Sequence, residues 1–119
     1  MKRSLCALVG ALLLGTSAGA ALAQDLYIGT LEVKKDQVIL TRCDLAANRY
    51  VLRDREGEQE KPVARLREKL KALKAPVYVE VIGEYAEIEG EDGAALDVIG
   101  LENLKAGKSC HLTDALGSN

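Results

Sequence analysis

Residues 62–76, PVARLREKLKALKAP, decide the fold, because the spacing of apolar residues changes here from that of a strand to that of a helix. The apolar residues recur at steps of three, four and three, which places them on one helical stripe: Val63, Leu66, Leu70 and Leu73. Pro62 suits the first helical turn, and Glu58 and Glu60 lie where the helix dipole favours negative charge. Pro76 ends the segment, so we expect one helix that buries its apolar stripe.

The other face of this helix is charged, with Arg65, Glu68, Lys69 and Lys71. A basic helix is compatible with a membrane-binding or partner-binding element. A solvated face above a buried stripe is the simpler interpretation, and we favour it.

Three strands are predicted before the helix. In DLYIGTLEV (25–33), Leu26 and Ile28 share one parity while Leu31 and Val33 share the other, which predicts a bulge or bend at Gly29. The polar residues KKDQ (34–37) separate this strand from VILTRCD (38–44), so the two form a hairpin. RYVLRD (49–54) is the third strand.

Two strands are predicted after the helix. VYVEVIGEYAEIEG (77–90) alternates apolar and polar residues and has a possible bend at Gly83. GEDG (90–93) forms a turn, and AALDVIGLENL (94–104) is the fifth strand with a possible break at Gly100. The order β-β-β-α-β-β predicts a mainly β, five-stranded, partly open OB-fold-like barrel whose helix plugs one end.

The N-terminal residues 1–23 have the layout of a secretory signal peptide. Lys2 and Arg3 precede an apolar stretch that is too short to span a membrane, and Ala21-Leu22-Ala23 matches a cleavage site. We expect cleavage between Ala23 and Gln24, leaving residues 24–119 as a single periplasmic or secreted domain that is soluble after removal of the signal peptide. Residue 24 is not a cysteine, so no lipoprotein anchor is expected.

The chain has three cysteines, and the expected cleavage removes Cys6. Cys43 and Cys110 then form an even pair in an oxidising compartment, which favours a disulfide bond between them. A bridge that closes so long a loop stabilises a fold by about 4 kcal/mol in the chain-entropy model.

Composition limits the possible partners. The sequence has no Phe and no Trp, so aromatic contacts can come only from four tyrosines, which can equally belong to the core: Tyr27, Tyr50, Tyr78 and Tyr85. Loss of Lys2 and Arg3 takes the net charge from −2 to −4. This acidic balance gives no obvious attraction to nucleic acid or anionic lipid, and we expect neither nucleic-acid binding nor stable membrane insertion.

Few residues suggest chemistry. Cys43, Cys110 and His111 could supply three ligands to zinc or copper, or a Cys-His nucleophile, but oxidation would consume both thiolates. His111 is then expected to be an exposed tail residue. The acidic stretch Glu84, Glu87, Glu89, Glu91 and Asp92 lacks the spacing of a calcium loop and is expected to be a solvated hairpin tip. We expect no catalytic residue, cofactor or metal.

Four segments together carry a family resemblance: LYIGTLEV (26–33), LTRCDLAANRYVL (40–52), VYVEVIGEY (77–85) and GKSCH (107–111). They resemble the C-terminal OB domain of the NlpE family of envelope-stress and copper-resistance lipoproteins. Cys43, Tyr50 and the G-x-S-C motif at 107–110 match that pattern, and the resemblance implies the same Cys43–Cys110 bridge. The sequence departs from the family because it has no C-x-x-C pair and no lipid-bearing cysteine.

These observations favour a small non-enzymatic periplasmic OB-fold protein that binds another protein or an envelope component. One alternative is a redox or envelope-stress sensor that acts through the Cys43–Cys110 bridge. Another is an inhibitor of a hydrolase that attacks the cell envelope.

Overall fold

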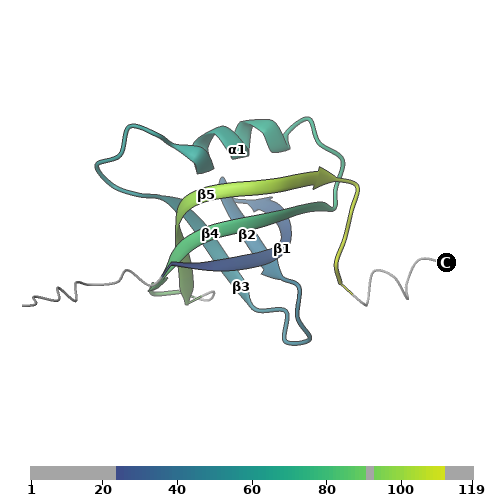
Figure 1. Cartoon of the computed structure of the whole chain (residues 1–119), viewed down its shortest axis with the longest axis horizontal. Coiled ribbons are helices and arrows are strands. Elements are labelled where there is room, and N and C mark those ends of the chain that lie inside the picture. Colours follow the sequence, from purple (N-terminus) through teal and green to yellow (C-terminus); the bar gives the residue numbers. More distant parts are fainter. Residues whose placement is uncertain (1–23, 91–92, 112–119) are drawn as a thin grey trace, which may run out of the picture.

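The computed structural model describes residues 24–90 and 93–111 and contains the five strands and one helix that the sequence predicts, in the predicted order (Figure 1). The elements are β1 (Gln24–Lys34), β2 (Gln37–Arg42), β3 (Arg49–Asp54), α1 (Pro62–Leu70), β4 (Val77–Glu87) and β5 (Ala94–Ala106). The expected signal peptide, residues 1–23, lies outside the described residues, so its cleavage stays a prediction. Within the described part of the chain, no helix is long and apolar enough to cross a membrane.

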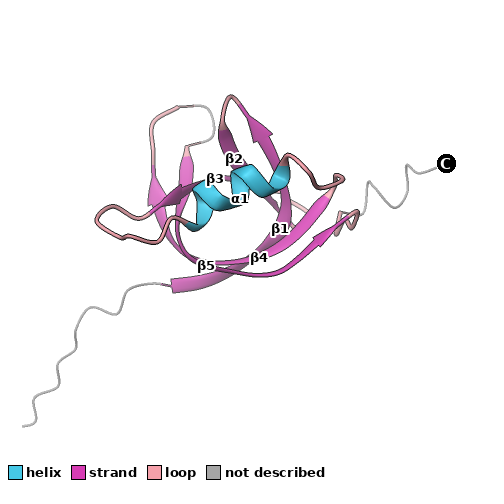
Figure 2. Cartoon of the chain, turned by 90° about the horizontal axis from the view of Figure 1, so that it is seen from above, coloured by secondary structure: helices cyan, strands magenta, loops and turns pink. Residues whose placement is uncertain are grey.

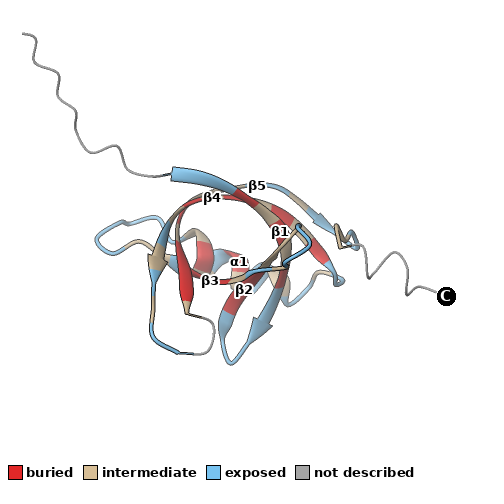
Figure 3. Cartoon of the chain, turned by 90° about the horizontal axis from the view of Figure 1, so that it is seen from below, coloured by how far each residue is buried: buried red, intermediate tan, exposed pale blue. Residues whose placement is uncertain are grey.

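The strands form a closed barrel in the order β1-β2-β3-β5-β4, in which β3 and β5 are parallel and the other neighbours antiparallel. Viewed from the side opposite α1, the strands make a ring with buried residues along their inner face (Figure 3). The OB-like fold class is confirmed, although the barrel is closed where the sequence suggested a partly open one.

β1 closes the barrel by pairing with two strands at once. Residues 24–31 pair with β4, residues 29–34 pair with β2, and Gly29 belongs to both ladders. A Cβ atom at Gly29 would overlap the carbonyl oxygen of Thr41, so only glycine fits this close approach.

The parity switch predicted at Gly29 is wrong. Tyr27, Gly29 and Leu31 are buried and share one inward parity, while Leu26 and Val33 are about half exposed. The apolar pattern predicted that Leu26 points inward, because leucine is more apolar than its neighbour Tyr27. In the structure Tyr27, which has a polar hydroxyl at its tip, fills the inward position at the barrel end.

The barrel interior is filled by branched aliphatic side chains with two tyrosines. Leu40, Val79, Val81 and Leu96 have no exposed surface, and the stripe residues Val63 and Leu66 of α1 join the same cluster. Leu70 and Leu73 pack against this cluster and are partly buried, which confirms the predicted stripe. α1 lies across one opening of the barrel (Figure 2).

The ends of α1 differ from the expectation. Glu58 and Glu60 precede the first turn, which contains no acidic residue, and Asp54, the last residue of β3, accepts hydrogen bonds from the backbone N–H groups of Val63 (2.7 Å) and Ala64 (3.1 Å). α1 ends at Leu70, before Pro76, and the residues that follow form tighter i→i−3 turns.

β5 continues through Gly100 to Ala106, so the predicted break there is absent. Its ladder with β4 shifts register twice, near Ile99 and near Asn103, which has a positive φ of 53°. These bulges bend β5 around the barrel without interrupting it.

Candidate functional site

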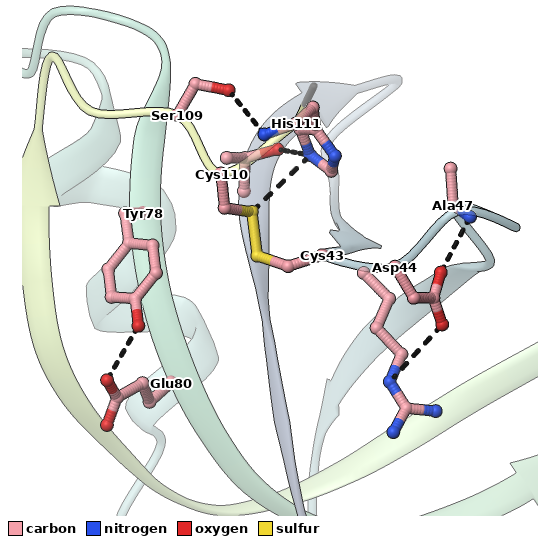
Figure 4. Close-up of a disulfide and its surroundings, with 10 residues drawn as sticks. Cys43, Asp44, Ala47, Tyr78, Glu80, Ser109, Cys110 and His111 are labelled. Atoms are coloured by element: carbon pink, nitrogen blue, oxygen red, sulfur yellow. Dashed lines mark hydrogen bonds and ion pairs between the residues drawn. A yellow bond between two sulfur atoms is a disulfide. The ribbon is translucent and has the colours of Figure 1, made fainter. Parts of the chain in front are cut away.

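The segment after β5, residues 107–111, runs back along the outside of the barrel, and we call it the C-terminal strap. Its course is set first by two backbone hydrogen bonds to the connection between α1 and β4. The N–H of Gly107 donates to the Lys74 carbonyl (2.9 Å), and that of Lys108 donates to the Pro76 carbonyl (3.0 Å). The strap then crosses toward the loop that follows β2, where Cys43 lies (Figure 4).

Cys43 and Cys110 form the disulfide that the sequence predicts, with their Cα atoms 5.5 Å apart and a separation of 67 positions in the sequence. The backbone N–H of Cys43 donates to the Ile28 carbonyl of β1 (2.8 Å), which fixes this end of the bridge to the barrel wall. The bridge therefore attaches the strap to the sheet at the point where β1 and β2 separate.

His111 is half-buried, which corrects the expectation of an exposed tail residue. Its Nε2 lies 2.8 Å from the Thr30 hydroxyl oxygen and 3.9 Å from the Cys110 sulfur, and its backbone N–H donates to the Ser109 hydroxyl (3.1 Å). Thr30 points outward from β1 toward the strap because its neighbours in sequence, Gly29 and Leu31, point inward. No pattern in the sequence points to Thr30, because only the path of the strap brings residue 111 to residue 30.

The strap and the barrel wall enclose a shallow groove of about 680 Å³. Thr30, Thr41, Pro76 and His111 are among its lining residues. The arrangement places the His111 imidazole 3.9 Å from a disulfide sulfur. If the bridge is reduced, the same ring nitrogen lies within reach of the freed Cys110 thiol.

The alternative metal sites are not assembled by the described residues. The sulfurs of Cys43 and Cys110 are bonded to each other, so neither is a thiolate ligand. In the acidic stretch, Glu84 lies 3.9 Å from the Arg55 Nε, and Glu91 and Asp92 fall outside the described residues. Across residues 24–90 and 93–111, no three His, Cys, Asp or Glu side chains are close enough to share a metal ion.

Three of the four tyrosines meet at the barrel end opposite α1. The rings of Tyr27 and Tyr50 contact edge to face with centroids 5.3 Å apart, and Tyr50 and Tyr85 do so at 6.4 Å. Tyr27 and Tyr50 are buried and belong to the core, whereas Tyr85 is 53% exposed. The Arg42 guanidinium lies over the Tyr27 ring at 5.3 Å. Burial, with a further contribution from the charge of Asp25, raises the pKa of Tyr27.

Two other large apolar side chains are exposed at the same end, Leu26 in β1 and Leu45 in the loop after β2. Leu45 is 93% exposed, which is unusual for a leucine. We call Leu26, Leu45 and Tyr85 the tyrosine end. Exposed apolar and aromatic side chains that gather in one region are typical of interaction surfaces.

The fourth tyrosine belongs to a polar network on the outer face of β4 and β5. The Tyr78 hydroxyl and the Asn103 amide each donate to the Glu80 carboxylate at 2.8 Å. These two hydrogen bonds, that of Asn103 first, lower the pKa of Glu80, and the bond to Glu80 raises the pKa of Tyr78. The Lys108 ammonium lies 4.8 Å from the centre of the Tyr78 ring, which connects the network to the strap.

The geometry defines a class: a closed five-stranded OB-type barrel with a helix at one end and a disulfide-bonded strap across its wall. No family model matches the sequence, and no curated protein matches it. Among solved structures, the chain is similar to NlpE from Escherichia coli, described with its crystal structure as the Cpx pathway activator. The TM-score is 0.53 at 15% identity, over 89% of this chain and 53% of the NlpE chain.

The chain therefore spans about half the length of the NlpE chain that it matches. This agrees with the expected resemblance to one domain of that family. At such an identity the likeness shows the fold, and the resemblance drawn from the sequence is confirmed at that level.

Proposed function

We propose that this chain is a non-enzymatic interaction module of the bacterial envelope that binds a protein or an envelope component through the tyrosine end. The observation that carries the proposal is the exposure of Leu26, Leu45 and Tyr85 around a buried aromatic pair. A large apolar side chain in solvent favours association because its burial against a partner releases ordered water.

The proposed compartment is the periplasm. The signal-like sequence at residues 1–23 and the Cys43–Cys110 disulfide both support it, since such bonds persist in oxidising compartments. The fold likeness to NlpE, a Cpx pathway activator, also supports a role in the envelope.

Site-specific crosslinking tests the interaction surface. A photoreactive amino acid at position 45 or 85 is expected to give a discrete adduct in cells, because both side chains are exposed at the tyrosine end. The same amino acid at Glu32, exposed on β1 outside the tyrosine end, is the matched control. Adducts of equal yield from position 32, or none from 45 and 85, would contradict the proposal.

A second candidate function is redox or envelope-stress sensing, favoured by the His111 imidazole beside the disulfide. In this role, reduction frees the strap from the barrel and changes what the protein binds. The measurement is the reduction potential: structural disulfides lie below about −300 mV, and regulatory ones lie higher.

A variant sharpens this test. In a sensor, His111→Ala is expected to lower the reduction potential, because the freed Cys110 thiol loses the ring nitrogen that lies beside it in the oxidised form. A potential below about −300 mV that His111→Ala leaves unchanged would assign the bridge a structural role only.

A further inference from the structure

Charge is distributed unevenly over the molecule, although the net charge of the mature chain is only −4. Between residues 61 and 74 there is one acidic residue, Glu68, and the net charge is +5. The six basic residues are Lys61, Arg65, Arg67, Lys69, Lys71 and Lys74. The remainder of the chain is therefore strongly acidic, and the net charge hides a separation that only the fold reveals.

Other segments add to the positive charge beside α1. The Arg67 guanidinium donates to the Asp36 carbonyl at 3.2 Å, which places the turn with Lys34 and Lys35 next to the helix. The bond from Gly107 to Lys74 brings the end of β5, with Lys105, to the same barrel end. We call this surface, formed by α1 and these neighbours, the basic end.

Most of these cations are free to meet a partner. Within the described residues, Arg65 pairs with Glu60 (3.4 Å) and Lys71 with Glu68 (3.0 Å). The other exposed lysines there form no ion pair with any described residue: Lys34, Lys35, Lys61, Lys69 and Lys74. Lys61, Arg65 and Lys69 lie four residues apart along the helix, on the exposed face away from Val63 and Leu66.

The opposite end of the barrel carries the opposite charge. Asp25, Asp44 and Glu87 lie at the ends of strands or in the loop on the side of the tyrosine end. Glu58, Glu60 and Glu102 lie with Arg65 and Lys69 around one hollow beside α1, so the basic end carries an excess of positive charge over acidic neighbours. This excess is opposite in sign to the charge near the tyrosine end, and a charged surface would orient the molecule.

We propose that the basic end binds the surface of an anionic phospholipid bilayer, so that α1 lies against the headgroups and the tyrosine end points away from them. The binding is peripheral and electrostatic, with no inserted segment. Each basic side chain near such a surface strengthens binding by about fivefold, and the cations are spread over three segments that one broad surface can contact together.

An acidic protein is a poorer occupant than a bilayer. Protein interfaces are depleted in lysine and centre on buried aromatic or aliphatic anchors. Among residues 24–90 and 93–111, four large apolar residues are exposed, and of these only Val33 lies near the basic end. The lysines of the basic end do not surround a cluster of apolar side chains. They are better suited to a fluid layer of phosphate headgroups, because the headgroups can move to meet each lysine.

Vesicle co-sedimentation of the exported, oxidised protein tests the proposal. We expect binding to phosphatidylcholine vesicles that contain about one-third phosphatidylglycerol, and none to pure phosphatidylcholine. Binding should weaken as salt rises from about 0.02 M to 0.5 M, because screening shortens the reach of the charges.

A pair of double variants separates position from net charge. Lys61→Gln with Lys69→Gln removes two exposed positive charges from the basic end and should weaken vesicle binding about twentyfold. Ala46→Glu with Asn48→Asp changes the net charge equally, but at exposed loop positions of the opposite end, and should leave binding nearly unchanged.

Equal losses in the two variants, or no binding to anionic vesicles at low salt, would overturn the proposal. Binding to heparin without binding to anionic vesicles would also overturn it, in favour of a soluble polyanion. None of these results depends on the partner of the tyrosine end, so the test is independent of the proposed function.

Discussion

Two segments cover the barrel, and they are held in opposite ways. α1 lies across one opening and is held by burial: Val63 and Leu66 are each only 3% exposed and join the core. The C-terminal strap crosses the outer wall, and none of its residues is fully buried. It depends on hydrogen bonds and on the Cys43–Cys110 bridge.

The difference shows what a covalent bond contributes in a small domain. An amphipathic helix buries enough apolar surface to offset the entropy of ordering it, whereas five half-exposed residues do not. A disulfide makes up the difference chiefly by restricting the unfolded chain. We therefore expect the helix to respond to loss of packing and the strap to respond to reduction.

The largest effect is expected from removal of the bridge. Cys43→Ser with Cys110→Ser should lower the free energy of unfolding by about 4 kcal/mol, because the unfolded chain gains the freedom of a long open loop. Urea unfolding of the variant and the oxidised protein measures this. A loss below about 1 kcal/mol would show that the bridge contributes little to stability. It would contradict the view that the strap depends on the disulfide as the helix depends on burial.

Loss of packing under the helix should come next. Leu66→Ala is expected to cost about 3 kcal/mol, because the side chain leaves a cavity in a core that relaxes only partly. Leu73→Ala, at a partly buried position of the same stripe, is the matched control and should cost less. Equal losses would mean that burial does not explain how α1 is held.

The connection between barrel and helix should have a smaller effect. Asp54→Ala removes the acceptor of two N–H groups of the first helical turn and should cost about 2 kcal/mol, seen as a lower urea midpoint. Asp54→Asn keeps one side-chain oxygen and should recover part of the loss. An unchanged midpoint for Asp54→Ala would show that these two hydrogen bonds do not stabilise the start of the helix.

The strap offers a comparable single hydrogen bond. Thr30→Val removes the hydroxyl that meets His111 and keeps the shape of the side chain, at an expected cost of about 1 kcal/mol in the oxidised protein. Thr41→Val in the same groove is the control, with little expected change. After reduction, both variants should match their reduced parent, because the strap is then released.

The smallest effect is a titration near the strap. The pKa of Glu80 is lowered in the folded protein, so its contribution to stability is present above the pKa of the unfolded chain and is lost as pH falls through the folded pKa. Tyr78→Phe removes one of the two hydrogen bonds and should raise the pKa of Glu80, which carbon-detected NMR can follow. A pKa unmoved by Tyr78→Phe would leave Asn103 as the main cause.

The elements that are periodic or local were predictable from sequence. The helix stripe from Val63 to Leu73 fixed the position of α1, and five strand-like runs around it fixed the barrel. Cys43 and Cys110 followed from the count that remains once residues 1–23 are set aside. In each case the prediction rests on the spacing of a few neighbouring residues or on the number of cysteines.

The details that failed depend on contacts distant in sequence. Asp54 accepts the first N–H groups of α1 because β3 ends beside the helix, and nothing in the local sequence of the helix indicates this acceptor. His111 lies against Thr30 only because the strap folds back, and no spacing in the sequence encodes that meeting. The inward parity of β1 is set by both neighbouring strands at Gly29, so its own apolar pattern was misleading.

The order of the thiols along the chain has a consequence for biogenesis. Because proteins are made from the N-terminus, Cys43 emerges while Cys110 is still many residues from synthesis. Once the expected cleavage has removed Cys6, a premature bond from Cys43 can only be with another molecule. The barrel also cannot close early, because β1 pairs with β4 and β3 pairs with β5, and both partner strands are made late. Completion of the sheet, whose last strand ends at Ala106, and arrival of the second thiol at residue 110 thus fall together, so the native bridge forms only in chains that carry all five strands.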